Sequence, residues 1–66
     1  MPVNNNKTIS GGTFQGEVYN DSTISGGTFQ GGSYNFRGTI SNGTFQGILR
    51  NDSGTISGGT FENTVE

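Results

Sequence analysis

The side chains able to perform acid–base or nucleophilic chemistry are few in this sequence, and they do not recur together. The carboxylates are Glu17, Asp21, Asp52, Glu62 and Glu66, and the chain has neither histidine nor cysteine. General acid–base catalysis needs titratable groups held within hydrogen-bonding reach of a substrate. Because no acid recurs in every repeat and none has a basic or nucleophilic companion at a fixed spacing, we expect no catalytic residues, no cofactor and no enzymatic activity.

Metal binding is not expected either. Without cysteine and histidine, the chain lacks the thiolate and imidazole ligands of zinc sites. Two Asn-Asp-Ser triplets, at residues 20–22 and 51–53, offer oxygen ligands for calcium. A calcium loop brings several oxygens together, whereas each triplet supplies one carboxylate and occurs in only two repeats. We therefore expect no metal site.

The charge and hydropathy patterns exclude two classes of partner. The net charge is −2 with only three basic residues, which is too few for the basic face of a nucleic-acid-binding protein. No apolar run exceeds two residues, so no segment is long enough to insert into a membrane. The first residues also lack the basic and apolar regions of a signal peptide. We expect neither nucleic-acid binding nor membrane insertion.

The dominant pattern is an internal repeat of 15 to 16 residues. The block Thr-Ile-Ser-Gly-Gly-Thr-Phe-Gln-Gly begins at Thr8 and Thr23, and returns with substitutions at Thr39 and Thr55. Self-similarity at a fixed period is the signature of repeat architectures. Residues 1–66 are therefore predicted to form a single repeat domain. Its units are residues 8–22, 23–38, 39–54 and 55–66, preceded by residues 1–7 as an N-terminal cap or incoming strand.

Within each repeat, polar and apolar residues alternate, as in Thr8-Ile9-Ser10. Alternation with a period of two and β-branched residues predicts half-buried strands, and glycine interrupts every window long enough for a helix. We expect an all-β protein in which each repeat contributes three short strands, each with one inward apolar side chain. The predicted core residues are Ile9, Phe14, Val18, Ile24, Phe29, Ile40, Phe45, Leu49, Ile56 and Phe61.

Two substitutions of glycine by asparagine suggest where the backbone turns. Asn42 stands where other repeats have Gly11, Gly26 and Gly58, and Asn63 stands where they have Gly16, Gly31 and Gly47. Asparagine is the residue that best replaces glycine in the left-handed region of backbone space. We therefore predict a positive φ, and hence a corner, at both positions.

The first architecture that fits this pattern is a β-solenoid, a parallel β-helix of about four coils of 15–16 residues. Equivalent residues then lie about 4.8 Å apart in successive coils. Inward columns of isoleucine and phenylalanine are joined by a third column, and asparagines form an amide ladder at one corner. Tyr34, Arg50 and Glu66 also align, so Arg50 is expected to stack on Tyr34 and to pair with Glu66. The third column contains Val3, Val18, Ser33, Leu49 and Val65, and the ladder contains Asn5, Asn20, Asn35 and Asn51.

The alternative architecture is an antiparallel meander of β-hairpins. Asn42-Gly43 and the equivalent Gly-Gly pairs are typical two-residue hairpin turns, which would pair Ile9 with Phe14 on one face. This arrangement joins strands of unequal length. The β-helix is favoured because in-register stacking selects identical residues at one phase, but both architectures remain open at the level of sequence.

Outward-facing threonine and serine residues form a candidate binding face in the solenoid. A Thr-x-Ser array on a β-helix resembles the Thr-x-Thr ranks of ice-binding solenoids, although both residue types also suit any exposed strand. A second array pairs threonine with glutamine, as in Thr13 and Gln15, and is a candidate surface for glycans. The residues of the first face are Thr8, Ser10, Thr23, Ser25, Thr39, Ser41, Thr55 and Ser57.

A core of about a dozen apolar side chains is thin for a domain of this length, and the end coils of a solenoid have open strand edges. We therefore expect self-association, as a homotrimer or an end-to-end stack, or docking onto flanking coils of a longer parent protein.

The recurring Thr-Ile-Ser-Gly-Gly-Thr-Phe-Gln-Gly block resembles the Gly-Gly-Thr-Phe repeats of bacterial surface and adhesin-like β-helix proteins. The resemblance covers most of residues 8–63. It implies a non-catalytic, self-assembling structural module of a fibre, stalk or surface adhesin, located outside the cell or on a cell or virion surface. A ligand-binding face for ice or glycan on the same scaffold is the alternative expectation.

Overall fold

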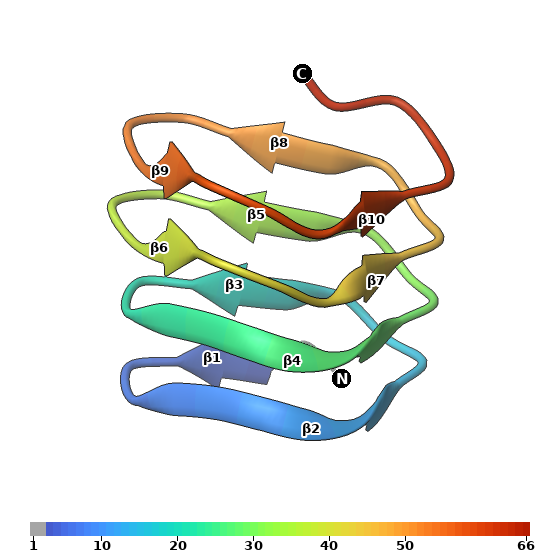
Figure 1. The fold of residues 1–66 in the computed structure, drawn as a ribbon, viewed down its shortest axis with the longest axis horizontal. Helices are drawn as coiled ribbons and strands as arrows, with labels where there is room; N and C mark the ends of the chain where they lie inside the picture. Colours follow the sequence, from blue (N-terminus) through green and yellow to red (C-terminus); the bar gives the residue numbers. More distant parts are fainter. Residues whose placement is uncertain (1–2) are drawn as a thin grey trace.

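The computed structural model describes residues 3–66, which form a stack of coils built from ten strands and no helix (Figure 1). No helical segment in this part of the chain is therefore available to cross a membrane. Each coil runs along one sheet, turns, and returns along a facing sheet (Figure 1). The strands are β1 (Val3–Asn5), β2 (Thr8–Phe14), β3 (Val18–Asn20), β4 (Thr23–Phe29), β5 (Ser33–Asn35), β6 (Thr39–Ile40), β7 (Thr44–Phe45), β8 (Leu49–Asn51), β9 (Thr55–Ile56) and β10 (Thr60–Phe61).

Every pairing between these strands is parallel, so the predicted all-β parallel solenoid is confirmed. The four-stranded sheet has the order β1-β3-β5-β8. The six-stranded sheet has the order β10-β7-β4-β6-β9, with β2 paired along the opposite edge of β4. In the first two coils β2 and β4 each run unbroken through the Gly-Gly pair, where the sequence had predicted two shorter strands.

The antiparallel meander is wrong, and the glycine conformations explain why. A two-residue hairpin turn of type I′ requires positive φ at both central residues. Only the second glycine of each pair has a positive φ: the values are 98° at Gly12, 109° at Gly27, 128° at Gly43 and 126° at Gly59. Here the left-handed glycine bends the chain within its coil, and the segments on both sides of it pair in parallel with the next coil.

The prediction of positive φ at Asn42 and Asn63 is also wrong, because no residue other than glycine has a positive φ in residues 3–66. Asn42 precedes the left-handed corner at Gly43, and its side-chain Oδ1 accepts a hydrogen bond from the Gly43 N–H at 2.9 Å. In the middle coils the position equivalent to Asn63 is glycine because the backbone of the neighbouring coil lies too close for a side chain. A Cβ on Gly31 would lie 2.8 Å from the Gly16 carbonyl oxygen.

The core consists of three columns of apolar side chains that run along the stack. Strand registers place Ile24 on Ile40 and Phe29 on Phe45, and all four are essentially excluded from solvent, as are Val18 and Leu49. Neighbouring phenylalanine rings are nearly parallel, with centroids 5.0, 4.7 and 5.4 Å apart. Such offset stacks add to the stabilisation from buried area. The remaining predicted core residues pack against this cluster but are only partly buried: Ile9, Phe14, Ile56 and Phe61.

The predicted amide ladder is present at the corner that follows the four-stranded sheet. Each Nδ2 group donates to the Oδ1 atom of the asparagine in the next coil, at 2.8 Å from Asn5 to Asn20, 2.8 Å from Asn20 to Asn35 and 2.9 Å from Asn35 to Asn51. Asn20 and Asn35 are at most 1% exposed. Buried amides without partners would be strongly destabilising, so the ladder fixes the register of the coils.

The ladder also explains how coils of 15 and 16 residues stack together. In the shorter coil the Asn20 amide donates to the carbonyl of Ser22, two residues later. In the longer coil the Asn35 amide donates to the carbonyl of Gly38, three residues later. A Cβ on Gly38 would lie 2.5 Å from the Asn20 Nδ2 atom, so the extra residue has to be glycine.

One member of the third column is polar. Ser33 stacks between Val18 and Leu49, is 3% exposed, and its hydroxyl has no hydrogen-bond partner among the described residues. An unpaired buried hydroxyl costs about 1 to 3 kcal/mol. We find no structural reason for serine at this place.

Replacing Phe29 with alanine is expected to lower the free energy of unfolding by about 3 to 5 kcal/mol, because it opens a cavity in the middle of the phenylalanine column. The matched control is Phe36→Ala, because Phe36 is 41% exposed and lies outside the column. Thermal unfolding followed by circular dichroism measures both variants. Equal effects of the two substitutions would contradict the assignment of the column.

Candidate functional site

The structure places the predicted Thr/Ser face on the six-stranded sheet, where only its threonines form a regular rank. Thr8, Thr23, Thr39 and Thr55 pair in register through four coils. The serine rank is interrupted, because Ser10 pairs with Gly26 across a β-bulge. The neighbouring Ser25 hydroxyl donates a 3.4 Å hydrogen bond to the Ile9 carbonyl, so it is engaged with the backbone of the coil below it.

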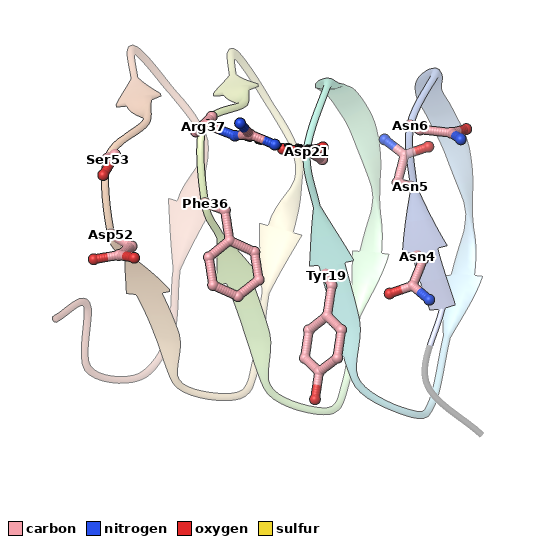
Figure 2. A pocket seen from close by; sticks show the side chains of 9 residues that line it. All are labelled: Asn4, Asn5, Asn6, Tyr19, Asp21, Phe36, Arg37, Asp52 and Ser53. Atoms are coloured by element: carbon pink, nitrogen blue, oxygen red, sulfur yellow. Dashed lines mark hydrogen bonds and ion pairs between the residues drawn. The ribbon is translucent and has the colours of Figure 1, made fainter.

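A second face, on the outside of the four-stranded sheet, gathers most of the aromatic side chains that are not in the core. The middle residue of each strand points outward and pairs in register: Asn4 with Tyr19, Tyr19 with Tyr34, and Tyr34 with Arg50. Phe36 follows β5 and joins them. We call Tyr19, Tyr34 and Phe36 the aromatic face; Figure 2 shows Tyr19 and Phe36 side by side on the outer surface.

The three rings of the aromatic face contact one another while staying open to solvent. The centroids of Tyr19 and Tyr34 are 5.1 Å apart in an edge-on arrangement, and Phe36 lies 6.1 Å from Tyr19 and 6.3 Å from Tyr34. Tyr19 and Tyr34 are half-buried and Phe36 is exposed. Mutual contact orients the rings, so the face presents a preformed apolar surface.

Two ion pairs flank the aromatic face. The Arg50 guanidinium lies 5.7 Å from the centroid of Tyr34, and its Nε lies 2.9 Å from Glu66 Oε1 in an ion pair, which confirms the predicted alignment of these three residues. Arg37 binds the Asp21 carboxylate through Nε and Nη2, both at 3.2 Å (Figure 2). Because both pairs are exposed, each contributes at most about 1 kcal/mol to stability.

An open depression on this face is lined in part by the rings of Tyr19 and Phe36. Residues 3–66 contain no cluster of three or more acidic side chains positioned to hold a metal ion. The depression offers ring faces, amides and charged groups to a ligand. Its lining residues are Asn4, Asn5, Asn6, Tyr19, Asp21, Phe36, Arg37, Asp52 and Ser53 (Figure 2).

The two ends of the stack are the other surfaces where the solenoid is incomplete. Ile24 and Phe29 in the second coil are fully buried, whereas Ile9 and Phe14 in the first coil are only partly covered. The last coil repeats this situation at Ile56 and Phe61. The exposed fractions of the terminal valines are 37% at Val3 and 46% at Val65. Each end thus presents apolar column ends beside an open strand edge.

These observations define the chain as a parallel β-solenoid repeat protein with a thin columnar core. No protein-family model, curated protein or solved structure matches it. Functional inference therefore depends on the surfaces that the fold itself creates.

Sequence reasoning did not find the aromatic face. The signal was partly available, because Tyr19 and Tyr34 alternate with inward residues and share a phase with Arg50. The position of Phe36 could not be predicted in this way, since the residue belongs to the irregular segment between repeats. Only the backbone path after β5, where the Phe36 N–H donates to the Asn20 carbonyl at 3.0 Å, brings its ring beside Tyr19.

The pKa of Tyr19 lies above its usual value, chiefly because the negative charge of Glu17 disfavours the tyrosinate. The Tyr19 hydroxyl also donates a 3.2 Å hydrogen bond to Glu17 Oε1. We expect Glu17→Gln to lower the pKa of Tyr19 toward its ordinary value, measured by NMR titration of the ring resonances. Glu62→Gln, in the last coil, is the control. An unchanged Tyr19 pKa in Glu17→Gln would contradict the assigned cause.

Proposed function

We propose that this protein is a non-catalytic structural module that self-assembles end to end, as a segment of a fibre, stalk or adhesin outside the cell or on a cell or virion surface. The observation that carries the proposal is the contrast between the closed middle coils and the open end coils. Ile40 and Phe45 are at most 1% exposed, whereas their equivalents in the terminal coils are only partly buried.

The physical basis is that a parallel stack has no intrinsic end. Each terminal strand retains backbone N–H and C=O groups that can pair with another strand. Stability in such repeats is one-dimensional, since each coil rests on its neighbours. A further coil would bury the outer surfaces of Ile9 and Phe14, or of Ile56 and Phe61, in contacts of the kind already present inside.

Axial association is better supported than a side-by-side trimer. The lateral surfaces carry the threonine rank, the exposed Gln15, Gln30 and Gln46, and the ion pairs beside the aromatic face. These polar groups are already solvated or paired. Association through the ends buries apolar surface and completes backbone ladders at the same time, which is the more favourable combination.

The proposal predicts that the sedimentation-derived mass of the wild-type protein rises with protein concentration. Phe14→Asp places a charge in the open end of the phenylalanine column and is expected to yield a monomer. Gln15→Asp adds the same charge to the exposed lateral surface of the same coil and should still assemble. Circular dichroism verifies that both variants are folded. A wild-type protein that stays monomeric at high concentration contradicts the proposal.

The aromatic face supports a second candidate function, the binding of a glycan. Sugar rings stack on aromatic side chains through their apolar faces, while hydroxyl groups bond to nearby amides and charged groups. Tyr19, Tyr34 and Phe36 supply the rings, and Asn4 and Asp21 supply polar groups in the adjoining depression. The Thr/Ser face supports ice binding less well, because its serine rank is broken at Ser10.

If a glycan binds here, Tyr34→Ala should weaken the affinity measured from retardation in gels containing soluble polysaccharides by about fivefold, since stacking on one ring contributes on the order of 1 kcal/mol. Thr39→Ala, on the opposite Thr/Ser face, should leave retardation unchanged. Greater loss in Thr39→Ala than in Tyr34→Ala would assign binding to the Thr/Ser face. Absence of retardation by any polysaccharide in a broad panel would remove this candidate.

A further inference from the structure

The amide ladder has a direction. Every rung runs the same way, from the Nδ2 group of one asparagine to the Oδ1 atom of the asparagine in the next coil toward the C-terminus. Each inner asparagine therefore accepts one ladder bond from below and donates one above. A ladder with a direction has two chemically different ends.

The last asparagine leaves a donor available. Asn20 and Asn35 each use Nδ2 twice, once for the next rung and once for a corner carbonyl. Among the hydrogen bonds of residues 3–66, the Nδ2 group of Asn51 makes only the corner bond, to the Gly54 carbonyl at 3.1 Å. One of its two hydrogens is thus not used within this part of the chain.

The first asparagine leaves an acceptor available. Asn5 is 8% exposed, and its Oδ1 atom accepts only a long bond of 3.4 Å from the Lys7 N–H among the described residues. The Oδ1 atom of Asn20 accepts an equivalent local bond from the Ser22 N–H and also accepts the ladder bond from the Nδ2 group of Asn5. A carbonyl oxygen has two lone pairs, so the Asn5 oxygen retains the capacity for one more strong bond.

We propose that a second copy of this chain stacks head to tail, with Asn51 of one copy donating to Asn5 of the next so that the ladder continues across the junction. This inference rests on the proposed end-to-end assembly and gives it a polarity. Head-to-head contact would place one Asn5 oxygen against another, and tail-to-tail contact would place donor against donor. Only the head-to-tail arrangement satisfies both ends at once.

The charge distribution favours the same arrangement. Lys7 is the only formally charged side chain in residues 3–16. The last coil carries Glu62 and Glu66, with Asp52 directly before it, and Arg50 is the one basic residue beside them, paired with Glu66. Head-to-tail stacking brings the basic end toward the acidic end, whereas the two symmetric arrangements bring like charges together. These charges are exposed, so their contribution falls with increasing salt concentration.

The junction requires residues 64–66 to move, because they lie along β8 in the position that β1 of an incoming copy needs. Val65 bridges to Leu49, and three backbone hydrogen bonds accompany the bridge: Leu49 N–H donates to the Thr64 carbonyl at 3.0 Å, Glu66 N–H to the Leu49 carbonyl at 2.8 Å and Asn51 N–H to the Glu66 carbonyl at 3.1 Å. β1 would replace this segment with a three-residue pairing like that of β5 with β8, with Val3 on Leu49 and Asn5 on Asn51. These three backbone hydrogen bonds and the exposed Arg50–Glu66 ion pair are exchanged for a complete strand that also continues the amide ladder.

One chemical change at the two ends of the ladder tests the polarity. Asn51→Asp keeps the oxygen that accepts from Asn35 but removes the outward donor, so end-to-end association measured by sedimentation should weaken at least about tenfold. Asn5→Asp keeps the outward acceptor but loses the hydrogen bonds from Nδ2 to Asn20, Lys7 and Thr23, so circular dichroism first has to show that the variant is folded. The folded Asn5→Asp protein is expected to associate within a few-fold of the wild type. Association of Asn51→Asp as tight as that of the wild type would overturn the proposed ladder junction.

Cysteine cross-linking tests the arrangement even if an aspartate variant fails to fold, and the chain has no cysteine of its own. Thr8 and Thr55 lie at opposite ends of the threonine rank. In a head-to-tail junction they become neighbours about 4.8 Å apart, within the range of a disulfide. Oxidising an equimolar mixture of Thr8→Cys and isotope-labelled Thr55→Cys should yield mainly the mixed disulfide by mass spectrometry.

The outcomes separate the two levels of the proposal. A random distribution of disulfides, or a predominance of either homodimer, in a protein that assembles would refute head-to-tail polarity and leave end-to-end assembly standing. A wild-type protein that is monomeric at every concentration would refute both.

Discussion

The structure depends on one constraint: each buried asparagine must find its hydrogen-bond partner in the coil above or below it. Asn20 and Asn35 are enclosed on every side, so their amides are satisfied only when the coils stack in parallel and in register. A slip of one residue would break the ladder and turn the inward columns toward solvent. The phenylalanine stack reinforces the same register but tolerates small displacements, since its contacts are not directional in the way hydrogen bonds are.

Much of the fold was predictable because repetition turns one-dimensional spacing into three-dimensional neighbours. The isoleucine and phenylalanine columns, the asparagine ladder and the Tyr34–Arg50–Glu66 alignment all follow from aligning the repeats. The corner was misplaced by one residue, because glycine occupies both positions of most Gly-Gly pairs and Asn42 was interpreted as evidence for left-handed backbone. In fact Asn42 uses its side chain to bond the N–H of the left-handed Gly43. The aromatic face depends on the irregular path around Phe36, for which the repeat provides no template.

The same constraint explains why the ends and one lateral face are the surfaces of interest. In a solenoid the middle coils have neighbours on both sides, which pair their backbone groups and bury their apolar side chains. The terminal coils have a neighbour on one side only, so unpaired donors, unpaired acceptors and exposed apolar area lie at the two ends. The direction of the amide ladder makes these two ends complementary and unlike each other. The lateral surfaces are mainly polar apart from Ile48 and the aromatic face, whose rings are ordered by mutual contact and by Arg50. Axial assembly and lateral recognition would therefore use separate parts of the molecule.

The central claim is that equivalent residues of successive repeats lie on one another in parallel strands. Nuclear Overhauser spectroscopy of the isotope-labelled protein tests it most directly. The account predicts cross-peaks between Ile24 and Ile40, between Phe29 and Phe45, and between the side-chain amides of Asn20 and Asn35, all of which are neighbours in the stack. Cross-strand cross-peaks between Ile9 and Phe14 in the absence of these contacts would indicate antiparallel hairpins and contradict it.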